Sequence, residues 1–228
     1  MLIVDVEASG TEYHKHSIVS IGAVDFERPE RQFYGECKIW EAVDIKGTSA
    51  GLVEAICEQC GAKCSTTGQS QLRAHIMEGA LAVNGFTEAE ITDPTKKTEG
   101  ELVREFLEWS QEMGDRTLTG QNVSFDRDFI KAASEREGLS WDLAYRTIDT
   151  HSLCWMHIVK RGKNLPIDPQ HRRSSLDLDA VLNYCGIPNE PEPHNALTGA
   201  LSHAEVTSRL LYDRKLMPEF EAYPIPWL

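Results

Sequence analysis

Two acidic residues, Asp5 and Glu7, end the apolar start of the chain, which reads MLIVDVE. The alternation of a β-strand would place Ile3, Asp5 and Glu7 on one face. Two ionised carboxylates at the end of a buried strand cost free energy unless a counter-charge is present. Hard oxygen ligands suit Mg²⁺ and Mn²⁺, so a divalent cation is one explanation. The alternative is a solvated strand end, which the spacing alone favours because Asp-x-Glu is a common tripeptide.

Two further clusters of polar residues lie far along the chain, each at the start of a predicted helix. Asn122, Phe125 and Asp126 follow a Gly-Gln turn, and His194 opens the sequence HNALTGA. Asp in a first helical turn is favoured by the helix macrodipole, and a lone histidine is more often structural than functional. A neutral imidazole, with an ordinary pKa of about 6.5, is nevertheless suited to taking a proton from water.

Together the three clusters resemble the motifs of the DEDDh 3′–5′ exonucleases. These enzymes are a branch of the RNase H-like superfamily that includes polymerase proofreading subunits, RNase T and oligoribonuclease. The resemblance extends from residue 1 to about residue 215, apart from one insertion. It rests on Asp5-x-Glu7, Asn122-x-x-Phe125-Asp126, His194-Asn195-Ala196-Leu197 and the segments GQNVSFDRDFI and SSLDLDAVLNYCGI.

The resemblance implies a site with two divalent ions, Mg²⁺ or Mn²⁺, and a role for each matched residue. Asp5 would bridge both ions, Glu7 would bind one, and Asp126 would act mostly through metal-bound water. His194 would be the general base, while Asn122 and Phe125 would contact the substrate. In this chemistry one ion makes a nucleophile and the other stabilises the leaving oxygen. The expected activity releases nucleoside 5′-monophosphates from single-stranded or frayed 3′ ends of DNA or RNA.

The chain departs from the family at its last metal-binding Asp, which lies five residues after the histidine. That position is Gly199, which brings no oxygen and costs about 1 kcal/mol in a helix relative to alanine. Neither Glu205 nor Asp213 matches the register. We expect an exonuclease scaffold of strongly reduced activity, which Gly199→Asp would raise by orders of magnitude. The alternatives are a catalytically silent protein that binds nucleic-acid 3′ ends, and a site completed by a carboxylate from elsewhere.

Three successive predicted strands followed by alternating strands and helices predict an α/β fold with a mixed central sheet and helices on both faces. The resemblance implies that this fold is of the RNase H-like type. The 228 residues suit a single domain, residues 1–228, with an inserted segment at about 42–73. The predicted strands are 2–7, 17–26, 31–40, 117–121 and 147–150, and ERPE is expected to form the turn before the third. The predicted helices are 75–83, 98–113, 124–137, 151–160, 175–185 and 197–214. The 98–113 helix carries capping-box spacing at Thr98 and Glu101.

The inserted segment contains Cys57, Cys60 and Cys64, and His75 follows eleven residues later. These four side chains are potential Zn²⁺ ligands, but the third cysteine is close to the pair for one tetrahedral site. If the segment is helical, its cysteines share an apolar face, so packed free thiols are the favoured interpretation. Cys37, Cys154 and Cys185 are expected to be core residues.

The net charge of −13 argues against a protein that coats long nucleic acid, because such proteins are usually basic. An acidic chain can still process nucleic acid if cations offset its carboxylates and only a short end enters the site. The segment 160–173 is locally basic and includes Arg172 and Arg173, which we expect to contact the phosphate backbone if the segment borders the site. A solvated loop is the alternative.

The remaining expectations concern the surroundings of the protein. No apolar run approaches the ~20 residues of a membrane span, and the start of the chain does not resemble a signal peptide. Six cysteines without a leader predict reduced thiols and a cytoplasmic location. A homodimer is compatible with the sequence, and the expected partners are single-stranded DNA or RNA ends.

Overall fold

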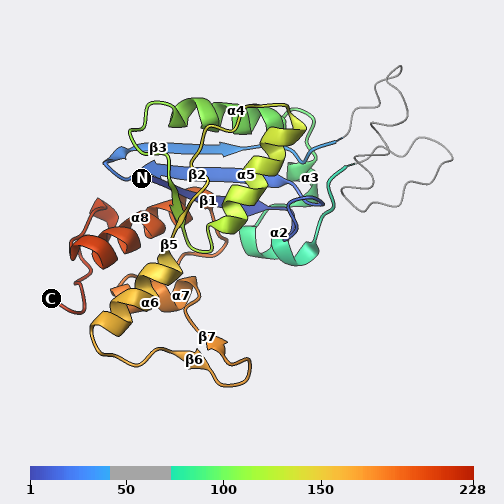
Figure 1. Ribbon diagram of the computed structural model, residues 1–228. Helices are drawn as coiled ribbons and strands as arrows, with labels where there is room; N and C mark the ends of the chain where they lie inside the picture. Colours follow the sequence, from blue (N-terminus) through green and yellow to red (C-terminus); the bar gives the residue numbers. More distant parts are fainter. Residues whose placement is uncertain (42–72) are drawn as a thin grey trace, which may run out of the picture.

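A computed structural model describes residues 1–41 and 73–228 of the protein. Its centre is a five-stranded sheet with the strand order β3-β2-β1-β4-β5 (Figure 1). The strands are β1 (Leu2–Ala8), β2 (Ile18–Asp25), β3 (Arg28–Glu36), β4 (Leu118–Gly120) and β5 (Ile148–Asp149). The described helices are α2 (Glu78–Asn84), α3 (Glu88–Ile91), α4 (Glu99–Ser110), α5 (Ser124–Arg136), α6 (Thr150–Lys160), α7 (Leu178–Cys185) and α8 (Ala196–Tyr212), followed by the short 3₁₀ helix η1 (Pro218–Phe220).

The sheet is mixed, because β1 pairs antiparallel with β2 and parallel with β4. Every residue of β2 is buried. Leu2, Val4 and Val6 of β1 pack in one apolar cluster with α4 and α5, and Ile3 packs with α8 in another. Helices therefore cover both faces of the sheet (Figure 1), and the predicted α/β fold with a mixed central sheet is confirmed.

A third apolar cluster lies beside the sheet, where α6 and α7 pack on α8. Cys154 of α6, Cys185 of α7 and Leu210 of α8 belong to it. The hairpin of β6 (Ile167–Asp168) and β7 (Arg173–Ser174) projects from this part of the molecule (Figure 1). Cys37 is also buried, so the prediction that these three cysteines are free core residues is confirmed.

A fully buried ion pair fixes the end of the chain to α8. Glu205 accepts a hydrogen bond from Arg209 Nε at 2.7 Å, and both side chains are inaccessible to solvent. Arg209 also donates to the backbone oxygens of Cys185 and Tyr223. The second oxygen of Glu205 accepts from the backbone N–H of Met217. Because both charges are fully hydrogen-bonded, the pair can be buried without an uncompensated charge.

Several element boundaries differ from the predictions. β3 begins at Arg28, because the turn uses only Phe26 and Glu27 and not the whole of ERPE. α2 begins at Glu78, since the backbone N–H groups of His75 and Met77 donate to Lys15 and Ser9 outside any helix. The helix α3 and the β6–β7 hairpin were not predicted. The capping box of Thr98 and Glu101 is present, as predicted.

No helix among the described residues is long and apolar enough to cross a membrane. Except for Arg73, the predicted insertion at 42–73 lies outside the described residues.

Candidate active site

The carboxylates of Asp5 and Glu7 lie on the face of β1 that α8 covers. Leu2, Val4 and Val6 pack toward the opposite face, so the alternation of the strand places the odd-numbered residues on the α8 side. Asp5 and Glu7 are both partly buried. The prediction that Ile3, Asp5 and Glu7 share one face is therefore confirmed.

A glycine on the neighbouring strand brings α8 close to these carboxylates. Gly22 pairs with Asp5 across the β1–β2 ladder. A Cβ at Gly22 would lie 2.1 Å from the backbone carbon of Ala196 and 2.3 Å from the nitrogen of Leu197. Only a residue without a side chain allows the first turn of α8 to approach the sheet here.

Asp126 lies in the first turn of α5 and is almost fully buried, at 3% exposed. The turn before the helix contains Asn122 in the left-handed region, with a φ of 51°, and its carbonyl accepts from the N–H of Phe125 at 2.9 Å. Asn122 is exposed, while Phe125 is partly buried with its ring 4.6 Å from that of Phe129. No side chain caps the start of α5 by a hydrogen bond.

His194 lies just before α8 and is partly exposed. Its backbone N–H donates to the carbonyl of Val83 in α2 at 3.0 Å. The next residue of α2, Asn84, donates to the backbone oxygen of Ala8 at the end of β1. The end of α2 thus connects the histidine to the strand that carries the carboxylates.

Electrostatic effects link the predicted side chains to one another. Burial raises the pKa of Asp5 well above its usual range, and the charges of Asp126, Glu7 and Glu190 add to this effect. Burial also raises the pKa of Glu7 to about 7; Glu190 raises it further, whereas His194 and a hydrogen bond from Asn84 lower it. The four residues predicted to carry the chemistry therefore lie in one neighbourhood.

Burial also raises the pKa of Asp126, to about 8. Backbone hydrogen bonds from Val6 and Asp126 itself counter this shift, and the charges of Glu7 and Asp149 increase it. No Lys or Arg is among the groups that stabilise the charged forms of Asp5, Glu7 or Asp126. When ionised, these three acids therefore carry negative charge that no Lys or Arg of the described residues offsets, and His194 acts in their favour only at Glu7.

This donor set suits a hard divalent cation. Ser20 supports that conclusion, because it pairs with Glu7 across the β1–β2 ladder and is fully buried. Its hydroxyl finds no hydrogen-bond partner among the described residues. In residues 1–41 and 73–228, however, no three His, Cys, Asp or Glu side chains already hold the geometry of a metal site. The carboxylates would have to reorient around an ion.

Gly199 lies in the first turns of α8, directly against Asp5. A Cβ at this position would be 2.4 Å from Oδ2 and 2.7 Å from Cγ of Asp5. Position 199 thus points into the carboxylate cluster, but the Asp5 carboxylate occupies the space that a side chain there would need. The two acids further along α8 are engaged elsewhere, Glu205 with Arg209 and Asp213 with the indole N–H of Trp227.

Arg172 and Arg173 are both exposed on the β6–β7 hairpin, and Arg172 has a left-handed φ of 55°. Ser174 of the hairpin contacts His151 Nε2 at 3.0 Å. Gln121, in the turn before Asp126, donates to the carbonyl of Leu176 just after the hairpin at 2.9 Å. The first contact attaches the hairpin to α6, and the second attaches the segment after it to the turn that leads into α5.

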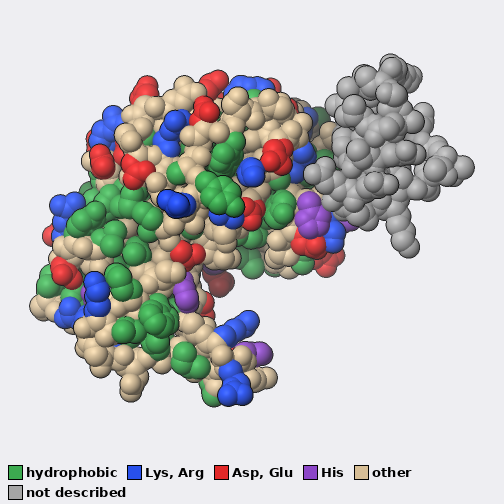
Figure 2. All heavy atoms as spheres, in the orientation of Figure 1, with side chains coloured by type: hydrophobic (Ala, Val, Ile, Leu, Met, Phe, Trp, Pro, Cys, Tyr) green, Lys and Arg blue, Asp and Glu red, His purple; other side chains and the backbone are tan. Residues whose placement is uncertain are grey.

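The surface between the hairpin and the rest of the molecule is hollowed. Figure 2 shows acidic side chains at this hollow and Lys or Arg side chains on its hairpin side. The predicted basic segment therefore borders a depression, and acidic side chains lie on the opposite side of that depression. This arrangement is expected if a cation-bound phosphate were to enter between the basic and the acidic side chains.

The predicted zinc ligands Cys57, Cys60 and Cys64 lie outside the described residues. The fourth, His75, is exposed, and its ring lies edge-on to that of His16 with the centroids 6.3 Å apart.

Three residues near the carboxylates were not predicted from the sequence. Glu190 and Asn84 act on Glu7, and Ser20 lies opposite it. Glu190 stands four residues before His194 in a proline-rich turn, so proximity to the histidine was the only sequence signal available.

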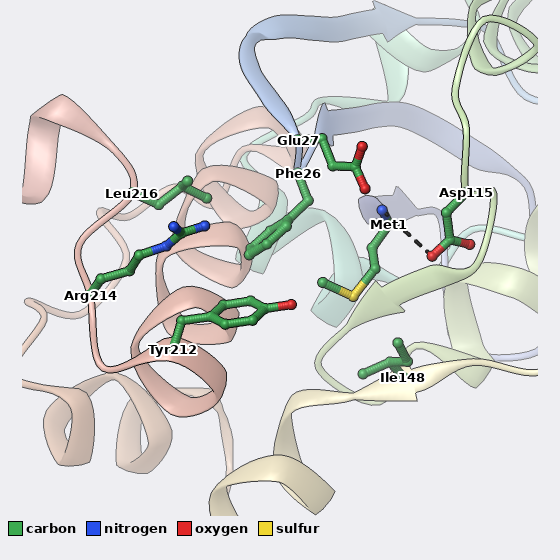
Figure 3. Close-up of a pocket in the computed structure, with 8 residues that line it drawn as sticks. All are labelled: Met1, Phe26, Glu27, Asp115, Ile148, Tyr212, Arg214 and Leu216. Atoms are coloured by element: carbon green, nitrogen blue, oxygen red, sulfur yellow. Dashed lines mark ion pairs between the residues drawn. The ribbon is translucent and has the colours of Figure 1, made fainter.

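A separate pocket of about 580 Å³ lies at the start of β1, at the other end of the strand from Glu7. Figure 3 shows the rings of Phe26 and Tyr212 on one side of it and the ion pair of the Met1 amino group with Asp115 on the other. Met1 and Glu7 are six residue steps apart along an extended strand, or roughly 20 Å. This pocket is therefore distinct from the carboxylate cluster.

Comparison with known proteins gives the family of the chain. The model of the Rv2179c-like 3′–5′ exoribonuclease domain matches residues 1–211. The structure of E. coli exonuclease I in complex with a dA16 oligonucleotide is similar, with a TM-score of 0.61 and 16% identity over 93% of this chain. The nuclease domain of 3′hExo, a DEDDh family member bound to rAMP, has a TM-score of 0.59 and 14% identity over 95% of this chain and 93% of its own length.

The match to E. coli exonuclease I covers about 40% of the length of that protein. At these identities the structural likeness shows a shared fold. No curated protein sequence matches the chain significantly. The predicted resemblance to the DEDDh exonucleases is confirmed, and the chain belongs to the Rv2179c-like 3′–5′ exoribonuclease domain family.

Proposed function

We propose that the protein is a divalent-metal-dependent 3′–5′ exonuclease that removes nucleoside 5′-monophosphates from single-stranded or frayed nucleic-acid ends. The observation that carries the proposal is the convergence of Asp5, Glu7, Asp126 and His194, which affect one another electrostatically although they are far apart in the sequence. Family membership and the fold support the same activity.

In this proposal, Asp5, Glu7 and Asp126 would hold Mg²⁺ or Mn²⁺. Bound divalent ions supply Lewis-acid stabilisation of phosphodiester oxygens and favour deprotonation of water. Side chains of the protein would accept the proton and exclude bulk water. His194, beside Glu7 and partly exposed, would accept the proton of the attacking water. Burial of Asp126 would keep bulk water away from one side of the site.

The substrate would approach along the exposed side of α5. Phe125 is partly exposed and offers a ring on which a terminal base could stack, as aromatic side chains do in single-strand binding. Asn122 offers an exposed amide next to it, and Arg172 and Arg173 would contact phosphates further along the strand. The oligonucleotide in the exonuclease I complex and the rAMP bound to 3′hExo support a substrate and a product of this kind.

Gly199 gives reason for a second candidate function, a protein that binds 3′ ends without cutting them. The position points at Asp5 but carries no oxygen, so the metal site lacks one ligand that the resemblance implies. We propose weakened catalysis as the first choice, because the other matched residues are all retained and gathered in one place.

The test uses matched DNA and RNA oligonucleotides carrying a label at either the 5′ or the 3′ end, with Mn²⁺, Mg²⁺ or EDTA. A 3′–5′ exonuclease releases the 3′ label at once as a mononucleotide and shortens the 5′-labelled strand stepwise. Asp126→Asn should lower the rate by at least about 100-fold, consistent with the losses seen when a group that stabilises the transition state is removed.

Asp128→Asn is the matched control, because Asp128 lies two residues further along α5 and pairs with Arg127 at the surface. Its rate should stay within about twofold of the parent chain, as expected for a surface pair of small energetic effect. If the parent chain retains a labelled 3′ end in Mn²⁺ without shortening it, the end-binding function replaces catalysis. Internal cleavage would exclude both.

A further inference from the structure

The first turn of α8 holds a carboxylate that no sequence motif assigned. Glu190 Oε1 lies 2.9 Å from the hydroxyl of Thr198 and 3.4 Å from the backbone nitrogen of Asn195. The Thr198 hydroxyl also lies 2.8 Å from the carbonyl oxygen of Asn195, so its proton has two acceptors. The residue after Thr198 is Gly199, whose missing side chain would meet Asp5. Glu190 is therefore attached to the helical turn that contacts the carboxylate cluster.

Glu190 also acts on the cluster itself. Its charge opposes the ionisation of both Asp5 and Glu7, and it is the strongest charge effect on Glu7. Both of its hydrogen bonds use Oε1, and among the described residues none uses Oε2. Glu190 thus adds a partly buried carboxylate with one free oxygen to a group of acids that has no Lys or Arg partner among the described residues.

We infer that Glu190 serves as the acidic residue of the metal site in place of the side chain that position 199 lacks. This inference rests on the proposed metal-dependent function. Three features carry it: the attachment of Glu190 next to Gly199, its unused oxygen and its action on both acids of β1. A fourth carboxylate placed here restores the four acidic groups that the resemblance implies for the site, although it comes from the turn before the helix and not from the helix.

The competing explanation is that Glu190 only caps α8. An anion near a helix N-terminus is stabilised by the exposed backbone N–H groups and the macrodipole. The two explanations differ in one measurable property. A cap contributes to the stability of the helix with or without metal, whereas a residue of the metal site also changes the affinity for the ion.

The experiment measures Mn²⁺ binding to the full chain by isothermal titration calorimetry and by the loss of the free-ion electron paramagnetic resonance signal. Glu190→Gln keeps an acceptor oxygen for Thr198 and Asn195 but removes the charge. We expect its Mn²⁺ affinity to fall by about tenfold or more, the range seen when residues that support metal ligands are changed. Its apo melting temperature should stay close to that of the parent chain.

Glu192→Gln is the matched control, since Glu192 lies in the same turn and is exposed. It removes the same charge and should leave the affinity unchanged. A double variant, Glu190→Gln with Gly199→Asp, should bind Mn²⁺ more tightly than Glu190→Gln alone, because the two positions would serve the same ions.

Each outcome decides between the explanations. If the parent chain binds Mn²⁺ and Glu190→Gln binds it equally well, Glu190 is a cap and the inference is wrong, while the proposed function stands. If the parent chain binds no Mn²⁺ or Mg²⁺, the metal-dependent function fails and the inference fails with it. If Glu190→Gln melts at a much lower temperature, Thr198→Val takes its place: it removes only the hydroxyl that contacts Glu190, and unchanged Mn²⁺ affinity in that variant would overturn the inference.

Discussion

At the scale of single residues, the contact between Gly199 and Asp5 determines what a side chain at position 199 can do. Replacing a helical glycine by alanine normally stabilises a protein by up to about 1 kcal/mol. Here the new Cβ would lie 2.4 Å from Asp5 Oδ2, so the carboxylate must move. We therefore predict that Gly199→Ala gives no gain in the free energy of unfolding, measured by urea denaturation without metal.

Gly79→Ala provides the control for this prediction. Gly79 lies in α2, is exposed, and has no atom within 4 Å of the position of a new Cβ. This substitution should raise the free energy of unfolding by roughly 0.5–1 kcal/mol. Equal stabilisation by both substitutions would show that the Asp5 carboxylate moves away at no cost.

We expect the same position to affect activity. We predict that Gly199→Asp raises the rate of mononucleotide release in Mn²⁺, but by less than the orders of magnitude expected for an empty ligand position, because Glu190 already takes part of that role. Asp5 has to turn aside to admit the new side chain. Gly199→Ala introduces the same Cβ without oxygens and should not raise the rate. Single-turnover assays on a labelled oligonucleotide would compare the three proteins. Equal rates for the aspartate and alanine variants would mean that position 199 contributes no ligand.

Some residues of the candidate site could be predicted from the sequence, and others could not. Asp5, Glu7, Asp126 and His194 could be identified because each belongs to a motif with fixed spacing. Glu190, Asn84 and Ser20 belong to no such motif. They lie near the cluster because the turn before α8, the end of α2 and the partner strand of β1 come together there in the fold. No local sequence pattern predicts such long-range contacts.

At the scale of secondary-structure elements, the β6–β7 hairpin is the candidate phosphate-binding element. Arg172 and Arg173 are exposed on it, and contacts of Ser174 and Leu176 attach it to the elements that flank Asp126. Each phosphate contact that is lost reduces the slope of log affinity against log salt by roughly 0.7 for a single strand. We predict that Arg173→Gln weakens oligonucleotide binding in Ca²⁺ or EDTA and flattens its salt dependence by about this amount.

Arg172→Gln should also weaken oligonucleotide binding and flatten its salt dependence. It leaves the free-energy cost of the left-handed backbone at position 172 unchanged, because glutamine, like arginine, has a Cβ. Arg104→Gln is the control, since Arg104 is exposed on α4, far from the hairpin in the fold. Fluorescence anisotropy at several salt concentrations gives the slopes. If the hairpin variants and the control have the same slope as the parent chain, the hairpin does not contact phosphate.

The elements themselves were predicted to different degrees, for physical reasons. α4 combines a capping box with an apolar stripe, and β1 and β2 are long and apolar, so local pattern and burial agree. β6 and β7 have two residues each, and α3 has four. Such short elements carry no measurable periodicity and depend on contacts with the rest of the fold.

At the scale of the whole molecule, the acids of the candidate site repel one another, whereas the charges in the interior are paired. The carboxylates of Asp5, Glu7 and Asp126 repel one another, and among the described residues no Lys or Arg lowers their pKa values. In contrast, Glu205 and Arg209 satisfy each other at full burial and hold the last part of the chain. The net charge of −13 adds to the repulsion, so a cation that binds the folded state would stabilise the whole protein.

The buried His203 makes stability depend on pH in a way that can be isolated. Burial lowers the pKa of His203 to about 4, and the carbonyl of Val4 counters this only in part. In the unfolded chain the ordinary value is about 6.5. The group therefore contributes stability that is fully present above pH 6.5 and is lost as the pH falls toward 4, because only the unfolded state then binds the proton.

We predict that His203→Leu removes this dependence. The pKa difference corresponds to roughly 3 kcal/mol, so the stability of the parent chain relative to the variant should fall by about that amount between pH 7 and pH 4. Urea denaturation at several pH values would measure it. The site carboxylates have raised pKa values and act in the opposite direction, but they are common to both proteins and cancel in the comparison. His14→Gln, at a partly exposed histidine, is the control, and a parallel pH profile for His203→Leu and the parent chain would show that His203 is protonated equally in both states.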